Sequence, residues 1–244
     1  MTAAASTRST ERKQSSLQAA RSALTREHIM AAAEVVFAEQ GFANTRMQDI
    51  ARGAEVSLTT LYQSFPGKDE LYRAVLIARD EQMLEEVMAE VQPLLQAPGT
   101  VEHILRLMEG HLRFLLNHPN YLKMQLQEGR VWYHSAAQPS LDEQLMWARG
   151  LAAMEQVFAW GISADLFVPG NVADHSRMLM AIEQARFANW MAAGMADEQA
   201  DVIAQIQADF VRQFCRPGVA AKLLSVDGIG LNPNAIERIR AIGT

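Results

Sequence analysis

Short polar side chains gather in one stretch of this 244-residue chain, between residues 57 and 68. Ser57, Thr59 and Thr60 can donate or accept hydrogen bonds, and a threonine methyl can also touch the methyl group of thymine. Tyr62 and Lys68 bring a phenol and an ammonium group, both suited to phosphate oxygens. A helix that enters the major groove of DNA needs short polar residues at its start and apolar residues behind them, and this stretch supplies both.

Three predicted helices position these residues. The first is expected to begin at Thr25 as its N-cap and to end at Gly41, because glycine favours the left-handed conformation that follows a helix. Thr45 and Gln48 have the spacing of a capping box, which predicts the start of a second helix, and Ser57 predicts the cap of a third. The residues expected to face a shared core are Ile29, Ala33, Val36 and Phe37, then Met47, Ile50 and Ala51, then Leu61 and Phe65.

A wider set of residues forms a specific combination around this stretch: Gly41-Phe42, Thr45, Asp49-Ile50-Ala51, Ala54, Val56-Ser57, Thr60-Leu61-Tyr62, Phe65, Lys68 and Leu71. With this set, residues 25 to 72 resemble the N-terminal domain of TetR-family (tetracycline-repressor-like) transcriptional regulators. The resemblance implies a helix-turn-helix that binds double-stranded DNA. The residues that we expect to contact DNA are Thr45, Arg46, Ser57, Leu58, Thr59, Thr60, Tyr62, Gln63 and Lys68.

Two positions depart from the family pattern. Glu55 stands in the turn where the family usually has glycine, and Gly67 stands where a serine-like cap often precedes the lysine. If Glu55 has a positive φ, a glutamate there costs about 1 kcal/mol relative to glycine. Its carboxylate would also bring a negative charge close to DNA.

The rest of the chain has the apolar spacing of helices, so we predict an all-α fold. Helices are expected over about 68–91, 101–117, 120–129, 140–163, 173–194 and 197–215, with Ser140 and Glu143 as a second capping box. The predicted organisation is a disordered basic arm over 1–24, a helix-turn-helix domain over 25–71, and a ligand-binding and dimerisation domain over 72–216. A tail follows over 217–244, with one short helix after Asn234.

The net charge of −6 is unevenly distributed along the chain. Residues 1–26 contain five basic residues and one acid, for a charge of +4, whereas residues 76–244 contain 13 basic and 20 acidic residues, for −7. Only one end of the protein is therefore expected to face phosphates. The single cysteine, Cys215, and the lack of a signal-like or membrane-spanning apolar run predict a cytoplasmic protein without disulfides, with no membrane partner.

The resemblance further implies a homodimer that reads a palindromic operator, and a pocket for a small apolar or amphipathic effector that releases a repressor from DNA. The expected dimer interface comprises Met178, Ile182, Ala185, Val202, Ile206 and Phe210, although such faces also suit an intrachain core. Met and aromatic residues, with some polar anchors, suggest a ligand site made of Met108, His111, Met124, Gln125, Arg130, Trp132, Trp147 and Met154. These residues could equally be ordinary core, and Arg130 could pair with Glu128 at the surface.

Two other classes of function compete with regulation. An enzyme is not expected, because the sequence contains no Gly-rich phosphate loop, no His-Glu-x-x-His and no Gly-x-Ser-x-Gly. His103, His111 and His118 recur at helical spacing but have no closely paired carboxylate, so we expect no metal and no cofactor. The remaining alternative is a helical module whose first domain binds another protein; it predicts no salt-dependent affinity for DNA.

Overall fold

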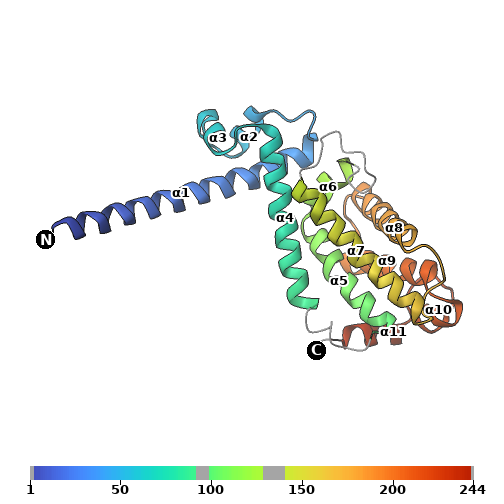
Figure 1. Cartoon of the computed structure of the whole chain (residues 1–244). Coiled ribbons are helices and arrows are strands. Elements are labelled where there is room, and N and C mark those ends of the chain that lie inside the picture. The colour runs from blue at the N-terminus through green and yellow to red at the C-terminus, as the bar shows by residue number, and fades with distance from the viewer. Residues whose placement is uncertain (1–2, 92–98, 129–140, 243–244) are drawn as a thin grey trace. The chain divides into compact units, whose positions relative to one another are not determined.

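The structure is a computed structural model that describes residues 3–91, 99–128 and 141–242. Over these residues the chain is helical, and the only β-type pairing is two isolated bridges, Phe167 with Cys215 and Leu224 with Leu231. The predicted all-α fold class is confirmed. The chain forms two compact units, unit 1 (Met1–Asp80) and unit 2 (Glu81–Thr244), whose helices are labelled in Figure 1.

Unit 1 contains α1 (Ala3–Gln40), α2 (Met47–Gly53), α3 (Leu58–Ser64) and the first part of α4 (Lys68–Val91). Gly41 ends α1 with a φ of 76°, as the sequence predicts. The predicted bounds of the helix over 68–91 are also confirmed.

The start of α1 differs from the prediction. The helix begins at Ala3 rather than at Thr25, so the segment predicted as a disordered arm is helical from Ala3 onward. Thr25 is not an N-cap, because its hydroxyl donates to the carbonyl of Arg21 at 2.9 Å, one turn back in the same helix. The physical reason is that residues 3–24 include no glycine or proline, so nothing stops a helix that is already nucleated from extending through them.

The core of unit 1 is the one that the apolar spacing predicts. Ile29, Ala33 and Phe37 of α1 are fully buried, and they meet buried residues of α2 and the buried Leu61 of α3. Phe65, directly after α3, is 1% exposed. Val36 is half-buried and lies at the edge of this core. The three inner residues of α2 are Met47, Ile50 and Ala51, each 7% exposed or less.

Unit 2 continues with seven further helices in the described residues: α5 (Val101–Asn117), α6 (Pro119–Glu128), α7 (Leu141–Ser163), α8 (Val172–Ala192), α9 (Gln199–Phe214), α10 (Pro217–Leu223) and α11 (Pro233–Arg240). α8 packs between α7 and α9, and α5 packs against α9. Thr100 and Asn171 cap α5 and α8 by accepting backbone N–H groups. Ser140, predicted to cap α7, lies outside the described residues.

The centre of unit 2 is aromatic. Phe158 of α7 and Phe167 in the loop after it lie with Phe210 and Phe214 of α9, and ring centroids are between 4.9 and 6.0 Å apart. All four side chains are 1% exposed or less. Each aromatic side chain buries a large apolar area, so this cluster contributes strongly to the hydrophobic stabilisation of unit 2.

The C-terminal segment is part of this core. It contains two helices, α10 and α11, instead of the single helix that the sequence predicts after Asn234. Pro217 does not interrupt helical structure here, because it occupies the first turn of α10, where proline is tolerated since its missing N–H has no helical partner. Leu223, Leu231 and Ile239 from this segment are buried in the unit 2 core.

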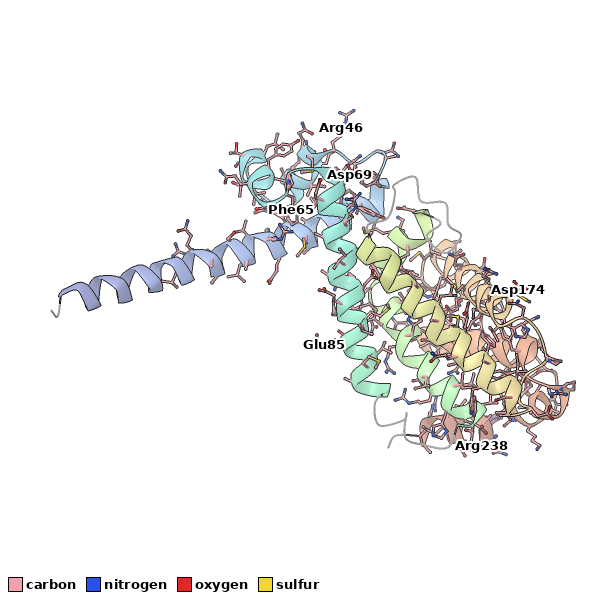
Figure 2. The ribbon with its side chains drawn as sticks, viewed as in Figure 1. Arg46, Phe65, Asp69, Glu85, Asp174 and Arg238 are labelled. Atoms are coloured by element: carbon pink, nitrogen blue, oxygen red, sulfur yellow. The ribbon has the colours of Figure 1, made fainter. Side chains whose placement is uncertain are left out.

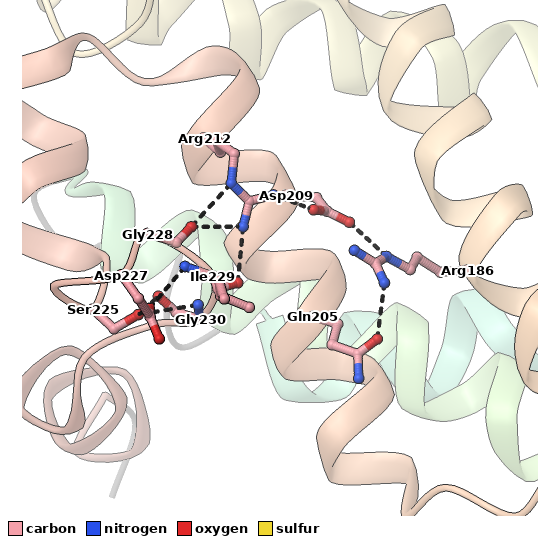
Figure 3. Close-up of polar contacts among 9 residues, drawn as sticks. All are labelled: Arg186, Gln205, Asp209, Arg212, Ser225, Asp227, Gly228, Ile229 and Gly230. Carbon is pink, nitrogen blue, oxygen red and sulfur yellow. Dashed lines mark hydrogen bonds and ion pairs between the residues drawn. The ribbon is translucent and has the colours of Figure 1, made fainter.

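Arginine side chains of unit 2 hold this segment in place (Figure 3). Arg212 of α9 donates to the carbonyls of Gly228 and Ile229, at 2.9 and 2.8 Å from Nη2, which fixes the turn between α10 and α11. Asp209 accepts from both Arg212 and Arg186, so the turn is linked through α9 to α8.

Candidate nucleic-acid interface

The recognition helix suggested by the sequence is α3, and its N-terminus is capped as predicted. The Oγ of Ser57 accepts the backbone N–H of Thr60 at 3.0 Å. The same oxygen lies 2.8 Å from the hydroxyl of Thr60. The Thr60 hydroxyl therefore has one partner within the cap, which occupies part of its hydrogen-bonding capacity.

Three polar side chains form the outward face of α3. Thr59, Tyr62 and Gln63 are exposed, and residues at positions i, i+3 and i+4 share one side of a helix. Tyr62 is 47% exposed although it is large and aromatic, whereas Leu61 beside it is fully buried. We define Thr59, Tyr62 and Gln63 as the outward face. Leu58, at the start of α3, is half-buried and lies beside it.

Lys68 is the first residue of α4, as predicted, but its ammonium group binds backbone carbonyls of its own chain. Its ammonium group donates to the carbonyls of Phe42, Ala43 and Thr45 at 2.7, 3.3 and 3.0 Å. It also lies 4.5 Å from the centre of the Phe42 ring. An ammonium group has three N–H donors, and all three are used. Lys68 thus holds the loop between α1 and α2 in this structure, and its predicted contact with phosphate stays a prediction.

Thr45 also differs from its predicted role. Arg46, not Thr45, is the N-cap residue of α2, and no side chain caps that helix. Thr45 is 2% exposed, and its hydroxyl donates to the carbonyl of Gly41 at 2.8 Å. The predicted capping box with Gln48 is therefore absent. The carbonyl of Gly41, directly after α1, also accepts the backbone N–H of Thr45 at 3.2 Å, so both groups of Thr45 are bound to this turn and its hydroxyl does not cap α2.

Two exposed arginines remain available on α2. Arg46 is exposed at the N-terminus of α2, and Figure 2 shows its side chain pointing away from the helices. The side chain of Arg52 is 79% exposed and forms a weak pair with Asp49 at 3.3 Å. An arginine with free N–H groups can form a bidentate contact with a phosphate. Arg46 is among the residues that the sequence predicts to contact DNA, and that contact stays a prediction.

The turn between α2 and α3 contains the predicted irregularity. Glu55 has a φ of 52°, the left-handed conformation that favours glycine, and its side chain is exposed. The family's usual glycine has therefore been replaced at a position where the backbone still requires the glycine conformation.

Two residues of α1 contact the ends of α2 and α3, and the sequence pattern gave no sign of either. Arg26 donates from Nη1 to the carbonyl of Ser64 at 2.6 Å, and its guanidinium lies 3.9 Å from the centre of the Phe65 ring. The Nε2 atom of His28 lies 3.0 Å from the carbonyl of Ala54. Charge and spacing could not identify these contacts, because the partners are backbone carbonyls 26 and 38 positions further along the chain.

The charge of unit 1 is close to neutral. It contains ten basic and nine acidic residues, for +1, while unit 2 contains 12 basic and 19 acidic residues, for −7. The sign asymmetry predicted from the sequence therefore divides along the two units. The basic excess of unit 1 comes from its first 26 residues, all but two of which lie in α1.

The residues proposed for a ligand site fall into three groups. Met124 is 1% exposed, Met108 and Met154 pack partly buried against the unit 2 core, and Gln125 donates to the hydroxyl of Tyr121. His111 keeps part of its surface exposed, but its ring is deep enough that desolvation lowers the pKa of the imidazole to about 4. Arg130 and Trp132, with the side chain of Trp147, lie outside the described residues.

A buried acid that the sequence reasoning missed lies on α8. Glu183 is 8% exposed, and its neighbours on the buried stripe of α8 are Ser176, Leu179, Phe187 and Trp190. Desolvation by burial raises the pKa of its carboxyl to about 7. A carboxyl at an inward position interrupts a largely apolar stripe, which is the signal that could have identified it.

The predicted dimer residues do not form one surface. Val202, Ile206 and Phe210 are 3% exposed or less within a single chain, where Phe210 belongs to the aromatic core. These three residues are therefore intrachain core, the alternative that the sequence left open, because their stripe faces α5 and α8. Met178 is 41% exposed and Ala185 is exposed on α8, while Ile182 is half-buried against the core.

Comparison with known proteins agrees with this architecture. The family model described as bacterial regulatory proteins, tetR family, matches residues 29–75. This range begins within α1, includes α2 and α3, and ends within α4. No curated protein sequence matches the chain.

Solved structures share the fold over most of the chain. PfmR, a TetR family transcriptional regulator from Thermus thermophilus, is 21% identical with a TM-score of 0.59, over 76% of this chain and 97% of PfmR. SmeT, the repressor of the Stenotrophomonas maltophilia multidrug efflux pump SmeDEF, is 19% identical with a TM-score of 0.57, over 80% and 92%. A transcriptional regulator from Saccharomonospora viridis, solved with choline, is 17% identical with a TM-score of 0.61, over 80% and 99%.

The match over residues 29–75 shows that this segment is similar to the DNA-binding domain of the tetR family of bacterial regulatory proteins. This match supports DNA-binding regulation of transcription, and the similar proteins named above are regulators. None of the helices described here is long and apolar enough to cross a membrane. No group of three or more His, Cys, Asp or Glu residues suited to a metal ion occurs among the described residues.

Proposed function

We propose that this protein is a sequence-specific regulator that reads DNA with the outward face of α3. The observation that carries the proposal is the combination of an anchored helix and an exposed polar face: Leu61 is fully buried, whereas Thr59, Tyr62 and Gln63 face solvent. Threonine and glutamine side chains can hydrogen-bond to base edges in the major groove, and a tyrosine hydroxyl can contact phosphate.

The proposed phosphate contacts come from Arg46, Arg52 and the basic residues of α1 other than Arg26. Arg46 precedes α2 and Arg52 lies in its last turn, and both are exposed. Among the described residues, the only contact that an approach to the DNA backbone would disturb is the exposed pair of Arg52 with Asp49. Phosphate contacts position the protein on the duplex, while base contacts select the sequence.

Selection from a random pool of DNA duplexes tests this proposal. The purified protein is expected to enrich one consensus, and Gln63→Ala should alter that consensus or abolish it. Gln40→Ala is a matched control, because Gln40 is an exposed glutamine at the end of α1, outside the outward face. The absence of enrichment at low salt, in protein freed of ligand by unfolding and refolding, would contradict sequence-specific binding.

We further propose that the protein is a homodimer that binds a palindromic operator. In the C2 dimer, two copies of α3 would read two half-sites one helical turn apart. The exposed residues Met178 and Ala185 of α8 are the predicted interface residues that remain available for this contact. An inverted repeat in the selected consensus supports the dimer, and a single non-repeated half-site argues against it.

The regulatory part of the proposal is a repressor released by a small molecule bound in unit 2. SmeT is a repressor, and the regulator from Saccharomonospora viridis was solved with choline, so this fold accommodates both properties in other proteins. In this chain, the side chains of Met108, Met154 and His111 offer partly buried apolar and polar groups, and Glu183 offers a buried acid. α4 runs without interruption from unit 1 into unit 2 and is the proposed route from ligand to DNA.

A ligand can act in this way only if it binds the two states with different affinities. Choline and decanoate are suitable first probes, because one is a cation and the other an amphipathic anion. A ligand that binds the folded protein raises the melting temperature with concentration. We expect the effective probe also to weaken binding to the selected duplex; a probe that stabilises the protein without changing DNA affinity would argue against the regulatory role.

A further inference from the structure

Arg26 contacts the end of α3 and His28 contacts the end of α2. These contacts suggest a role that could not be inferred from the charge of the two side chains. Both side chains come from α1, which is anchored in the unit 1 core by the buried Ile29, Ala33 and Phe37. Arg26 reaches the carbonyl of Ser64, the last residue of α3. His28 reaches the carbonyl of Ala54, the residue that ends α2.

These carbonyls are the groups that a helix end leaves without an intrahelical partner. A cationic group at a helix C-terminus satisfies such a carbonyl and also interacts favourably with the helix dipole. Arg26 does both for α3. Its guanidinium also lies on the ring of Phe65, at 3.9 Å, and Phe65 is itself 1% exposed and immobilised in the core.

The length of α3 makes its ends important. It has seven residues, about two turns, and a helix this short has little stability of its own. Its direction must come from the contacts that hold it: the buried Leu61 in the middle, the Ser57 cap at the start and Arg26 at the end. The outward face belongs to the same helix, so the direction in which its side chains point depends on these contacts.

The contact made by His28 acts on the turn before α3. Ala54 immediately precedes Glu55, whose φ of 52° is unfavourable for a residue with a side chain. The bond from His28 to the carbonyl of Ala54 therefore fixes the backbone next to the strained position. Together, the two α1 side chains hold the end of each helix of the helix-turn-helix.

We propose that Arg26 and His28 are positioning residues for DNA recognition: they fix the direction of α3 and thereby sequence discrimination, without contacting DNA. The inference rests on the DNA-binding function proposed above. It also gives Arg26 a role of its own. The other basic residues among residues 1–26 are expected to attract phosphates electrostatically.

The test compares two duplexes, the consensus selected by the wild-type protein and a scrambled sequence of the same composition, titrated at several salt concentrations. Arg26→Ala is expected to weaken binding to the consensus about five- to tenfold, from the loss of one charge-assisted bond and one cation–π contact, with little change on the scrambled duplex. The salt dependence should stay as in the wild type. His28→Ala should also reduce the ratio of the affinity for the consensus to the affinity for the scrambled duplex, by a smaller factor than Arg26→Ala.

Arg21→Ala is the matched control. Arg21 is an exposed arginine on the same helix, so its loss removes the same charge while leaving the end of α3 intact. We expect Arg21→Ala to preserve the ratio of consensus to scrambled affinity. A residue that contacts phosphate instead weakens both duplexes and lowers the salt slope by about one.

Amide hydrogen exchange gives a readout that needs no DNA. Arg26→Ala should speed exchange in residues 61–65, at the end of α3, while Arg21→Ala should not. Equal weakening on both duplexes with a lower salt slope would overturn the proposal in favour of a phosphate contact. Unchanged affinities and unchanged exchange would overturn it as well. If the wild-type protein selects no consensus, the DNA-binding proposal fails separately, and exchange alone then decides whether Arg26 holds α3.

Discussion

The two units differ in which parts of their helices make the stabilising contacts. In unit 1, polar side chains hold helix ends: Ser57 at the start of α3, Arg26 at its end, and Lys68 on the loop before α2. In unit 2, long helices meet along apolar stripes, and the aromatic cluster around Phe158 and Phe210 fills the centre. The difference follows from length, because α2 and α3 have seven residues each, whereas α7, α8 and α9 have between 16 and 23.

The comparison shows why charge was a weak guide to function in unit 1. Lys68 and Arg26 both lie near the proposed DNA-binding surface, but their charged groups bind backbone carbonyls of their own chain. Around the short helices α2 and α3, cations satisfy carbonyls of helix ends and loops. In unit 2 the unusual charge is the opposite kind, the buried carboxyl of Glu183 on a largely apolar stripe.

The largest expected effect comes from the aromatic centre of unit 2. Phe210→Ala should lower the free energy of unfolding by about 3–5 kcal/mol, the usual cost of deleting a buried ring. Denaturant unfolding measures it, with Met178→Ala as the control, since Met178 is 41% exposed and should cost much less. A Phe210→Ala protein that unfolds like the wild type but loses self-association would restore the dimer role that the sequence predicted for this residue.

The second effect depends on pH and concerns Glu183. Its pKa is raised from 4.5 to about 7 in the folded protein, so between these values the folded state binds a proton that the unfolded chain releases. Stability therefore falls as the pH rises through this window. Glu183→Gln should remove the loss, raising the free energy of unfolding by about 2–3 kcal/mol at pH 8 and by little at pH 4.5.

Glu237→Gln is the control for this experiment, because Glu237 is an exposed glutamate on α11. It should change stability little at either pH. Equal effects of Glu183→Gln at both pH values would mean that the burial of the carboxyl does not control its protonation.

The third effect tests the role of Lys68 in unit 1. Lys68→Ala removes three bonds from a charged donor to loop carbonyls and should lower the free energy of unfolding of unit 1 by about 2 kcal/mol. Arg46→Ala, which removes an exposed cation, should leave stability within about 0.5 kcal/mol but lower the salt slope of DNA binding by about one. If Lys68→Ala lowers the salt slope and leaves stability unchanged, the phosphate contact predicted from the sequence is right.

The smallest effect concerns the turn between α2 and α3. Glu55→Gly should stabilise unit 1 by up to about 1 kcal/mol, because glycine adopts a φ of 52° without strain. Thermal unfolding measures the change, and Glu39→Gly, in the regular helix α1, should instead destabilise. Stronger binding of Glu55→Gly than of wild type to scrambled DNA would further show that the carboxylate weakens DNA affinity.

The sequence by itself determined the local structure of the helix-turn-helix. Apolar spacing identified the buried residues Ile29, Phe37, Ile50 and Leu61, because a helix with a single apolar face turns that face toward the core. Ser57 and Gly41 act as the predicted cap and helix end, since both signals depend only on nearby backbone groups. The family resemblance rests on the same short-range pattern, and the match over residues 29–75 agrees with it.

Only the tertiary structure decided which partner each polar or ambiguous side chain has. Lys68 and Arg26 bind carbonyls more than 20 positions away, and no spacing rule predicts such pairs. Val202, Ile206 and Phe210 have the pattern of either an interface or a core, and the packing of α9 against α5 and α8 made them core. A periodic pattern specifies that a face is buried, while the arrangement of the other helices specifies what buries it.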